Sequence, residues 1–248
     1  MKDKIALNAV ESLALNVIEA IKAHAETEQP RECCGLLVEM SDGWDYWPCR
    51  NMSPLPNQFH LHPEDWAEAE DSGEIKAVVH SHINQSAAPS QADLAGCEAS
   101  NLPWVILSIP SGEIRTLAPT GWLMPLVGRE FVWGISDCYI LVRDYYRETL
   151  GIVFATPEPY EYEFWKRGHD LYARYEQWGF VLVPADQPPQ LHDVFLIQIK
   201  SDVANHAAIY LGDDKILHHV QGRLSERTVY GGFWHKSTRF TVRHRSLC

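Results

Sequence analysis

Two histidines and an aspartate lie close together in the stretch VVHSHINQSAAPSQAD, residues 78–93. Zinc takes about four N, O or S ligands in a tetrahedron, and a catalytic zinc keeps one position for water. His80 and His82, two residues apart, would project from one face of a strand. Asp93 would lie one turn into a helix that begins at Ser90. The three residues are either the ligands of an open zinc site or unrelated polar groups.

The surrounding sequence resembles the JAMM (MPN-domain) metallopeptidases over about residues 5–118. PRECCGLL, residues 30–37, matches the family's Pro-x-Glu-x-Cys-Gly-Leu-Leu around its catalytic glutamate, and residues 51–66 match its Asn…Pro…Phe…Pro-Glu stretch. The resemblance implies an α/β fold, a JAMM-type sheet with flanking helices. It also implies Zn²⁺ as the cofactor.

The resemblance assigns a role to each polar residue of this set. His80, His82 and Asp93 would hold the metal, and Glu32 would act as general base for the metal-bound water. Ser90 would hydrogen-bond the developing oxyanion or the water, or serve as a helix cap, or both. Ile83 departs from the family, which often has proline there, and the cysteines near the site are predicted to pack in the core: Cys33, Cys34 and Cys97.

A second candidate for chemistry is the thiol of Cys138, at the start of a predicted helix, where the helix dipole favours a thiolate. His206 begins a strand-like run, and His218 follows twelve residues later, after a predicted turn at Gly212–Asp214. In a hairpin both rings could approach the thiol. The alternative is that Cys138 is a small buried apolar residue.

The second half resembles the NlpC-type papain-like cysteine peptidases, which cleave peptidoglycan stem peptides, over about residues 126–248. The matching stretches are SDCYILVRDYY, LHDVFLIQI and NHAAIYLGDDKILHHV. The resemblance implies an α+β papain-like domain, a helix followed by an antiparallel sheet. Cys138 would be the nucleophile, His206 the base and His218 the residue that orients it. Tyr139 and His192 replace the family's usual serine and glycine, and His219 is predicted to face away.

Apolar periodicity and turn residues predict the elements that position these groups. We expect helices at residues 5–27, 63–72, 91–100 and 138–150, a helical patch at 162–178, and strands at 33–40, 43–49, 75–82, 103–110, 113–119, 193–199, 205–220 and 239–245. The predicted domains are 1–118 and 129–248, joined by a linker at 119–128 that contains proline and glycine.

Charge and hydropathy exclude some classes of protein. The formal net charge of −12 disfavours binding to a phosphate backbone, so no nucleic-acid partner is expected. We expect no membrane span, because no apolar run approaches the roughly 20 residues required. The first 26 residues have helical periodicity unlike a signal peptide, which predicts folding in a cytoplasm with reduced cysteines.

The order of the two domains resembles that of tail assembly proteins from lambda-like long-tailed bacteriophages. This resemblance implies phage tail tip proteins and peptidoglycan peptides as partners. It places the chain in the host cytoplasm during assembly, then at the virion tail tip and in the periplasm at entry. Three hypotheses stay open: a two-site peptidase of a phage tail, a tail scaffold whose sites are little used, and a cellular bacterial peptidase acting on a small protein tag or wall peptide.

Overall fold

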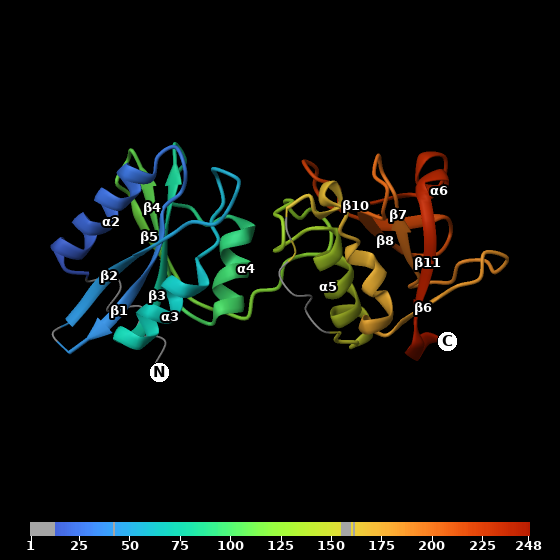
Figure 1. The fold of residues 1–248 in the computed structure, drawn as a ribbon, viewed down its shortest axis with the longest axis horizontal. Coiled ribbons are helices and arrows are strands. Elements are labelled where there is room, and N and C mark those ends of the chain that lie inside the picture. The colour runs from blue at the N-terminus through green and yellow to red at the C-terminus, as the bar shows by residue number, and fades with distance from the viewer. Residues whose placement is uncertain (1–12, 42, 155–159, 161) are drawn as a thin grey trace. The chain divides into compact units, whose positions relative to one another are not determined.

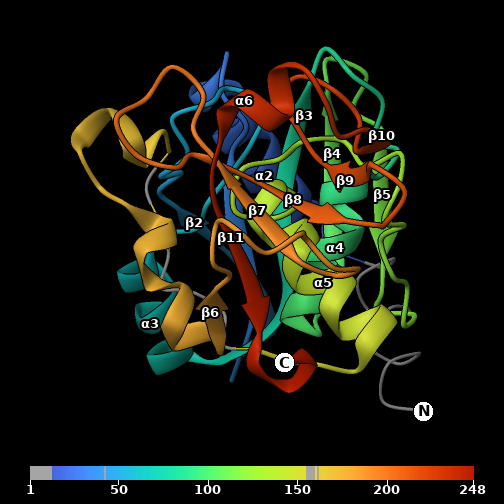
Figure 2. The same ribbon diagram turned by 90° about the vertical axis from the view of Figure 1, so that its right-hand side faces the viewer.

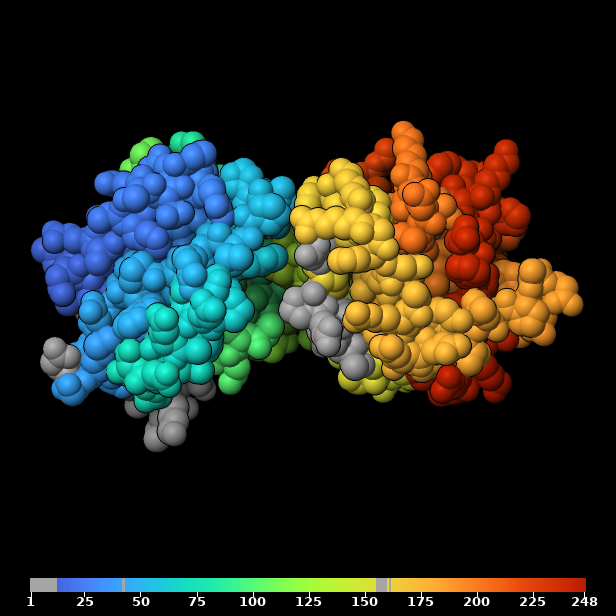
Figure 3. Space-filling model, viewed as in Figure 1, coloured from blue at the N-terminus to red at the C-terminus, as the bar shows by residue number. Residues whose placement is uncertain are grey.

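The structure, a computed structural model, describes residues 13–41, 43–154, 160 and 162–248. The chain divides into two compact units, Met1–Leu123 (unit 1) and Met124–Cys248 (unit 2) (Figures 1 and 3). The predicted linker at residues 119–128 stays a prediction. None of the helices in the described ranges is both long and apolar enough to span a membrane.

Unit 1 is built on a five-stranded sheet with the order β2-β1-β3-β4-β5. Its strands are β1 (Cys34–Met40), β2 (Gly43–Cys49), β3 (Glu74–Ile83), β4 (Trp104–Ile109) and β5 (Ile114–Leu117). β3 and β4 pair in parallel, and the other neighbours are antiparallel. A parallel pair needs a crossover, which α4 (Gln91–Ser100) supplies between β3 and β4.

Helices cover both faces of this sheet (Figure 1). α2 (Leu15–Glu28) packs on one face, where it contacts side chains that include Ala77 and Val79 of β3. α3 (Pro63–Ser72) and α4 cover the other face, where Val78 is buried. Side chains alternate along a strand, so His80 and His82 lie on the same face as Val78, toward α4. The predicted α/β sheet with flanking helices is confirmed.

Local signals predicted the helices near the polar residues correctly. α3 begins with Pro63 after the N-cap His62, and α4 begins after the N-cap Ser90. The prediction of one helix over residues 5–27 was wrong at Leu13 and Ala14, which are not helical. The backbone of Ala14 is extended, and its carbonyl accepts the first bonds of α2. Residues 5–12 lie outside the described residues.

Unit 2 is built on a six-stranded antiparallel sheet with the order β10-β9-β8-β7-β11-β6. Its strands are β6 (Phe180–Leu182), β7 (Val194–Ile197), β8 (His206–Tyr210), β9 (Lys215–His218), β10 (Glu226–Val229) and β11 (Thr238–His244). α5 (Cys138–Leu150) packs on one face, with the largest core cluster of the unit. Tyr230 and Trp234 pack against the other face. The predicted helix followed by an antiparallel sheet is confirmed.

The termini of α5 follow the sequence signals. Asp137 caps the helix by accepting from the backbone of Tyr139 and Ile140, and Gly151 ends it with a left-handed φ of 66°. The hairpin turn also forms, with positive φ at Gly212, Asp213 and Asp214.

Other elements of unit 2 differ from the prediction. The helical patch at 162–178 consists of two 3₁₀ helices, η1 (Phe164–Arg167) and η2 (Leu171–Trp178), separated by Gly168 in the left-handed region. The sequence did not predict β6, β10 or α6 (Phe233–Ser237), whose three to five residues are too few to show a period. A last 3₁₀ turn, η3 (Arg245–Leu247), ends the chain.

Candidate metal and thiol sites

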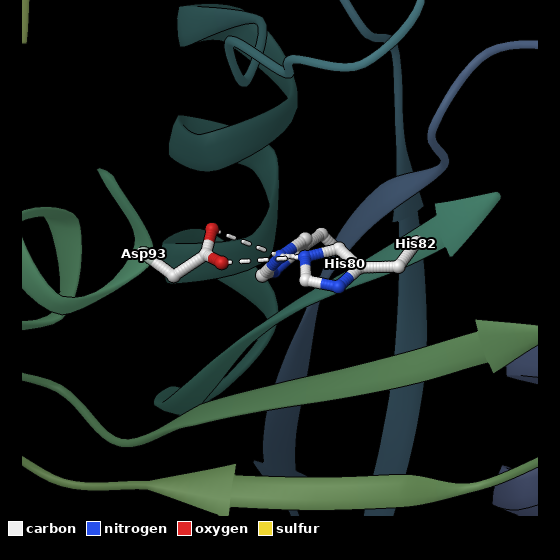
Figure 4. Close-up of side chains that lie close together, drawn as sticks. All are labelled: His80, His82 and Asp93. Carbon is white, nitrogen blue, oxygen red and sulfur yellow. Dashed lines mark hydrogen bonds and ion pairs between the residues drawn. The ribbon is translucent and has the colours of Figure 1, made fainter. Parts of the chain in front are cut away.

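The structure brings His80, His82 and Asp93 into contact (Figure 4). The Nε2 atoms of the two histidines are 3.2 Å apart. Asp93 Oδ1 lies 3.1 Å from Nε2 of His80, and Oδ2 lies 3.2 Å from Nε2 of His82. The rings come from β3 and the carboxylate from the first turn of α4, so the crossover helix delivers the third group to the strand.

The spacing of these atoms fits a tetrahedral cation. Zinc–ligand bonds of about 2.0–2.1 Å place neighbouring ligand atoms roughly 3.3 Å apart. The nitrogen–nitrogen separation of 3.2 Å is close to that value, and so is the distance of 3.1–3.2 Å from each nitrogen to the nearer of the two Asp93 oxygens. Two imidazole nitrogens and one carboxylate oxygen are donors that zinc accepts, and a fourth position is left for water. The residues present therefore fit the metal that the sequence resemblance implies.

Asp93, the third residue of α4, also helps to cap the helix. Its backbone N–H donates to Ser90 Oγ at 3.1 Å, and the backbone N–H of Ser90 donates to Asp93 Oδ2 at 2.7 Å. This reciprocal pair is a capping box. Ser90 is thus a helix cap, as one of the two predicted roles required. Its hydroxyl accepts in this bond and keeps its own proton for another partner.

Charges in this cluster favour an ionised carboxylate. Burial disfavours the charged form of Asp93, but hydrogen bonds from His80 and His82 outweigh it and hold the pKa of Asp93 far below its usual range. Burial lowers the pKa of His80. Burial also opposes protonation of His82, but Asp93 and the carbonyl of Ser86 raise the pKa of His82 overall.

Glu32 is buried beside this cluster, just before β1. Burial raises the pKa of Glu32 to about 8, with His82 opposing the rise and Asp93 adding to it. A cation among the ligands would lower this pKa, because positive charge stabilises the carboxylate. The structure therefore places Glu32 where its protonation responds to the charge of the ligand set.

Contacts around the two histidine rings differ. Nδ1 of His82 lies 2.8 Å from the carbonyl oxygen of Ser86, the type of outer contact that fixes the tautomer of a metal ligand. Nδ1 of His80 has no hydrogen-bond partner among the described residues. Packing holds this ring instead: it stacks on Phe59 at 4.7 Å and meets Trp104 edge-on at 5.4 Å between ring centroids.

Two residues that the sequence did not single out hold the backbone at Glu32 and Cys33. Ser81 stands between the two histidines, and its hydroxyl accepts from the backbone N–H of Cys33 at 2.9 Å. The side-chain amide of Asn51 donates to the carbonyl of Glu32 at 2.9 Å. Sequence reasoning noticed Asn51 only as part of a matching stretch, because a contact across 19 residues has no local pattern.

The predicted core cysteines of unit 1 are free and buried, in keeping with a packing role. Burial raises the pKa of Cys33 to about 11 and that of Cys97 to about 12, and it raises the pKa of Cys34 as well. These thiols are therefore protonated and inert at neutral pH.

In unit 2, Cys138 is the first residue of α5 and is buried. Its Sγ lies 3.3 Å from the hydroxyl of Tyr172, which comes from η2. Burial raises the pKa of the Cys138 thiol to about 12; Asp137 adds to the rise, while Tyr172 and the backbone of Ala207 oppose it. The thiol is therefore neutral in this structure despite its position at a helix start.

The structure brings His206 and His218 together on the hairpin of β8 and β9. Nε2 of His206 lies 3.2 Å from Nδ1 of His218. Trp234 of α6 covers both rings, at 5.7 Å from His206 and 4.4 Å from His218 between centroids. Within the described chain, no hydrogen bond joins either ring to Cys138. From β8, it is the backbone of Ala207, next to His206, that interacts with the thiol.

Burial keeps both histidines neutral. It lowers the pKa of His206 to about 3 and that of His218 to about 4; the nearby His219 adds to both shifts, and Arg223 adds to that of His218. A neutral imidazole can accept a proton from a thiol, so the pair has the protonation state that a general base requires.

The two departures from the NlpC-type pattern have clear structural consequences. His192 stands where the family has glycine, and its φ of 77° is the left-handed conformation that favours glycine. Nδ1 of His192 lies 2.7 Å from the hydroxyl of Tyr145, and Tyr146 donates to the His192 carbonyl. Tyr139 packs in the core, 4.7 Å from Trp178 between ring centroids. Neither change touches the histidine pair.

His219, predicted to face away, makes contacts other than those of His218. It packs edge-on against Phe131 at 5.0 Å, and its Nε2 lies 3.1 Å from the carbonyl of Arg223. Tyr172 and Trp234, which touch the thiol and the histidine pair, were missed by sequence reasoning. Tyr172 lies in η2 and Trp234 in α6, and the sequence did not predict either element in the form that the structure has.

Family models match both halves of the chain. A model described as prokaryotic homologs of the JAB domain matches residues 15–119. The model of the NlpC/P60 family matches residues 128–243. Two domains of peptidase families therefore follow one another in the order that the sequence resemblance implied.

Similar proteins are found in phages and in bacteria. Tail tip assembly protein K of Escherichia phage N15 is 43% identical over 234 residues, which cover 93% of this chain and 95% of that protein. Tail tip assembly protein K of Escherichia phage lambda is 39% identical over 189 residues, with 75% of this chain and 90% of that protein covered. CysO-cysteine peptidase of Mycobacterium bovis is 30% identical over 101 residues, with 38% of this chain and 69% of that protein covered.

Proposed function

The chain belongs to the family of phage tail tip assembly protein K, and we propose that it is a peptidase with two independent sites. Unit 1 would hydrolyse a peptide or isopeptide bond with zinc, and unit 2 would cleave peptidoglycan stem peptides with a thiol. Both activities would serve tail tip assembly, penetration of the cell wall during DNA entry, or both.

The contact between His80, His82 and Asp93 is the observation that carries the proposal for unit 1. These three residues would hold the zinc, which would polarise its bound water and the substrate carbonyl. Glu32 would take a proton from the water and deliver it to the leaving amine. Ser90 would donate a hydrogen bond from its hydroxyl to the developing oxyanion while it caps α4. The resemblance of unit 1 to a protein named as a peptidase supports this substrate class.

Metal content tests the proposal for unit 1. We expect about one zinc per chain in the purified full-length protein, and almost none in His80→Ala. His60→Ala is the matched control, because His60 is an exposed histidine of the same unit outside the ligand set. Metal-free protein, or equal zinc in both variants, would overturn the zinc site.

In unit 2, Cys138 would be the nucleophile and His206 its base. The thiol sulfur would attack the carbonyl carbon of a stem-peptide bond while His206 takes its proton and passes it to the leaving amine. Water would then hydrolyse the thioester, returning the thiol and releasing the acid. His218 would orient His206 through the 3.2 Å contact between their ring nitrogens.

Digestion of purified peptidoglycan tests this second site. We expect Cys138→Ala to lower the release of soluble peptides by at least about 10³-fold, because the nucleophile is lost. Cys248→Ala is the control, since Cys248 is an exposed thiol of the same unit. Equal digestion by wild type and Cys138→Ala would exclude the thiol mechanism.

One observation favours a scaffold role for unit 2 instead. Cys138 is buried, its pKa is raised to about 12, and among the described residues no hydrogen bond joins it to His206. If unit 2 is a scaffold with a little-used thiol site, phage that carry Cys138→Ala should still form plaques. Phage plating with this variant, beside the digestion assay, separates the two roles.

The same family membership supports a setting for both activities. The protein would act in the host cytoplasm while the tail tip is built, in contact with other tail tip proteins. It would then reach the periplasm with the tail at entry. Its presence or absence in purified virions, measured by mass spectrometry, distinguishes the two stages.

A further inference from the structure

Unit 2 has a hollow of about 380 Å³ at the end of its sheet where β7 ends and β11 begins. Its lining is rich in hydrogen-bond donors: the residues include Lys200, Lys236, Arg239, Gln198, Ser201 and Ser237. The three cationic side chains are exposed, whereas Gln198 and the two serines are half-buried. The hollow therefore has a polar floor and a cationic rim.

The charge of this hollow contrasts with that of the chain, whose formal net charge is −12. Lys200, Lys236 and Arg239 have no ion-pair partner among the described residues. Arg239 donates to the side-chain oxygen of Gln198 at 2.8 Å, which fixes one end of the rim. Three cations without a carboxylate partner around a donor-rich hollow suit an anionic ligand, and a carboxylate accepts several such donors at once.

The hollow lies at the same end of the sheet as the histidine pair. His206 is the first residue of β8 and pairs with Ile197, the last residue of β7. Gln198 follows immediately. α6, at the end of the sheet where β11 begins, links the two sites (Figure 2): its Trp234 contacts both histidine rings, and its Lys236 lines the hollow.

We propose that this hollow binds a free carboxylate of the peptide substrate and holds it beside the histidine pair. The inference rests on the proposed thiol peptidase function of unit 2. A peptide advances about 3.3–3.6 Å per residue when extended. Lys236 lies two residues after Trp234, which packs on His206, so a carboxylate within a few residues of a scissile bond at His206 would reach it. The hollow would select acidic peptides and reject amidated ones.

Binding to full-length Cys138→Ala tests the inference without cleavage. The probes are a synthetic stem pentapeptide with all of its carboxylates free and its fully amidated analogue, measured by titration calorimetry. We expect the acidic peptide to bind at least tenfold more tightly. Adding Lys236→Met and Arg239→Met should abolish this preference. Lys215→Met is the matched control, because Lys215 is an exposed lysine at the opposite end of β9 from His218.

The outcomes separate this inference from the proposed function. Equal affinity for the two peptides, or a preference that survives the double substitution, overturns the carboxylate site. Retained preference without thiol-dependent digestion by wild type would contradict the peptidase function and leave the binding site in place. In an active enzyme, the double substitution should raise KM for the acidic peptide about tenfold and leave kcat within twofold.

Discussion

Each candidate site holds a pair of buried histidines, but the two pairs have different partners. His80 and His82 share a buried carboxylate, Asp93, whose charge they stabilise. His206 and His218 contact each other and Trp234, and the nearest carboxylate, Glu226, lies 3.8 Å from His218. The first cluster stabilises the negative charge of a buried carboxylate, whereas burial keeps the second histidine pair uncharged.

This difference indicates how far each site is assembled before any ligand arrives. In unit 1, the candidate ligand atoms already lie at about the spacing that a tetrahedral cation requires, so binding would need little rearrangement. In unit 2, burial keeps both the thiol and the imidazoles neutral, and the proposed proton transfer would require a change of environment at Cys138. Apo forms of catalytic sites often have such loose geometry, which tightens on substrate binding.

The largest effect expected from this comparison is that Glu32→Gln strongly reduces hydrolysis by unit 1 and leaves hydrolysis by unit 2 unchanged. The amide keeps the shape of the side chain but cannot take a proton. Hydrolysis of a fluorogenic isopeptide by unit 1 should fall by about 10²–10⁴-fold. Zinc content and peptidoglycan digestion should stay at wild-type values. If Glu32→Gln also loses wall digestion, the two sites are not independent; if it loses zinc, Glu32 supports the metal site and is not only a base.

A smaller effect is a loss of stability of unit 2 in acid, which its buried histidines His206 and His218 should cause. Their pKa values drop to about 3 and 4 on folding, whereas a histidine in the unfolded chain titrates near 6.5. As the pH falls from about 6.5 to 4, the unfolded chain binds protons that the folded unit does not. Each histidine therefore lowers the free energy of unfolding by up to about 1.4 kcal/mol per pH unit.

Hydrogen exchange of β8 and β9 peptides in the full-length protein measures this loss of stability. His218→Gln should reduce the slope with pH, and His169→Gln, an exposed histidine of the same unit, should not. A flat profile over this range would mean that the histidine pair is not held in a neutral state by burial.

The smallest effect should come from packing behind the metal site. A Cβ at Gly96 of α4 would overlap the ring of Trp104, which in turn packs edge-on against His80. Gly96→Ala should lower the free energy of unfolding by about 1–3 kcal/mol through this overlap. It should also weaken zinc about tenfold by shifting a ligand ring.

Zinc affinity, measured by competition with a chelator, checks the effect of Gly96→Ala. Ala99→Gly is the control, because it changes one methyl group at an exposed position of the same helix. This control should cost about 1 kcal/mol of helix stability and leave zinc affinity unchanged. If Gly96→Ala binds zinc as wild type does, the first site is less tightly packed than the structure indicates.

Much of unit 1 followed from local sequence signals. The alternation of β3 determines that His80 and His82 share a face, and the capping signal at Ser90 determines where α4 begins and hence where Asp93 lies. Both signals depend on residues that are close together in the sequence, so the folded structure keeps the local arrangement that they predict. The start of α5 at Cys138 was predictable for the same reason, with Ser136 or Asp137 as the candidate cap; Asp137 is the cap that forms.

Contacts made between distant segments were not predictable in this way. Tyr172 reaches Cys138 across 34 residues, and Asn51 reaches Glu32 across 19. Trp234 belongs to a helix of five residues, too short for a periodic pattern. The site residues of both units stay predictions as to role, although the structure brings most of each set together.

The capping box of α4 links the metal site to the dynamics of the backbone. Asp93 uses Oδ2 both for His82 and for the backbone N–H of Ser90, so the start of the helix and the ligand set share one carboxylate. Two equilibria that share a group are thermodynamically coupled. Fraying of the first turn of α4 would therefore be coupled to loss of the proposed metal, and the amide protons of that turn would report the occupancy of the site.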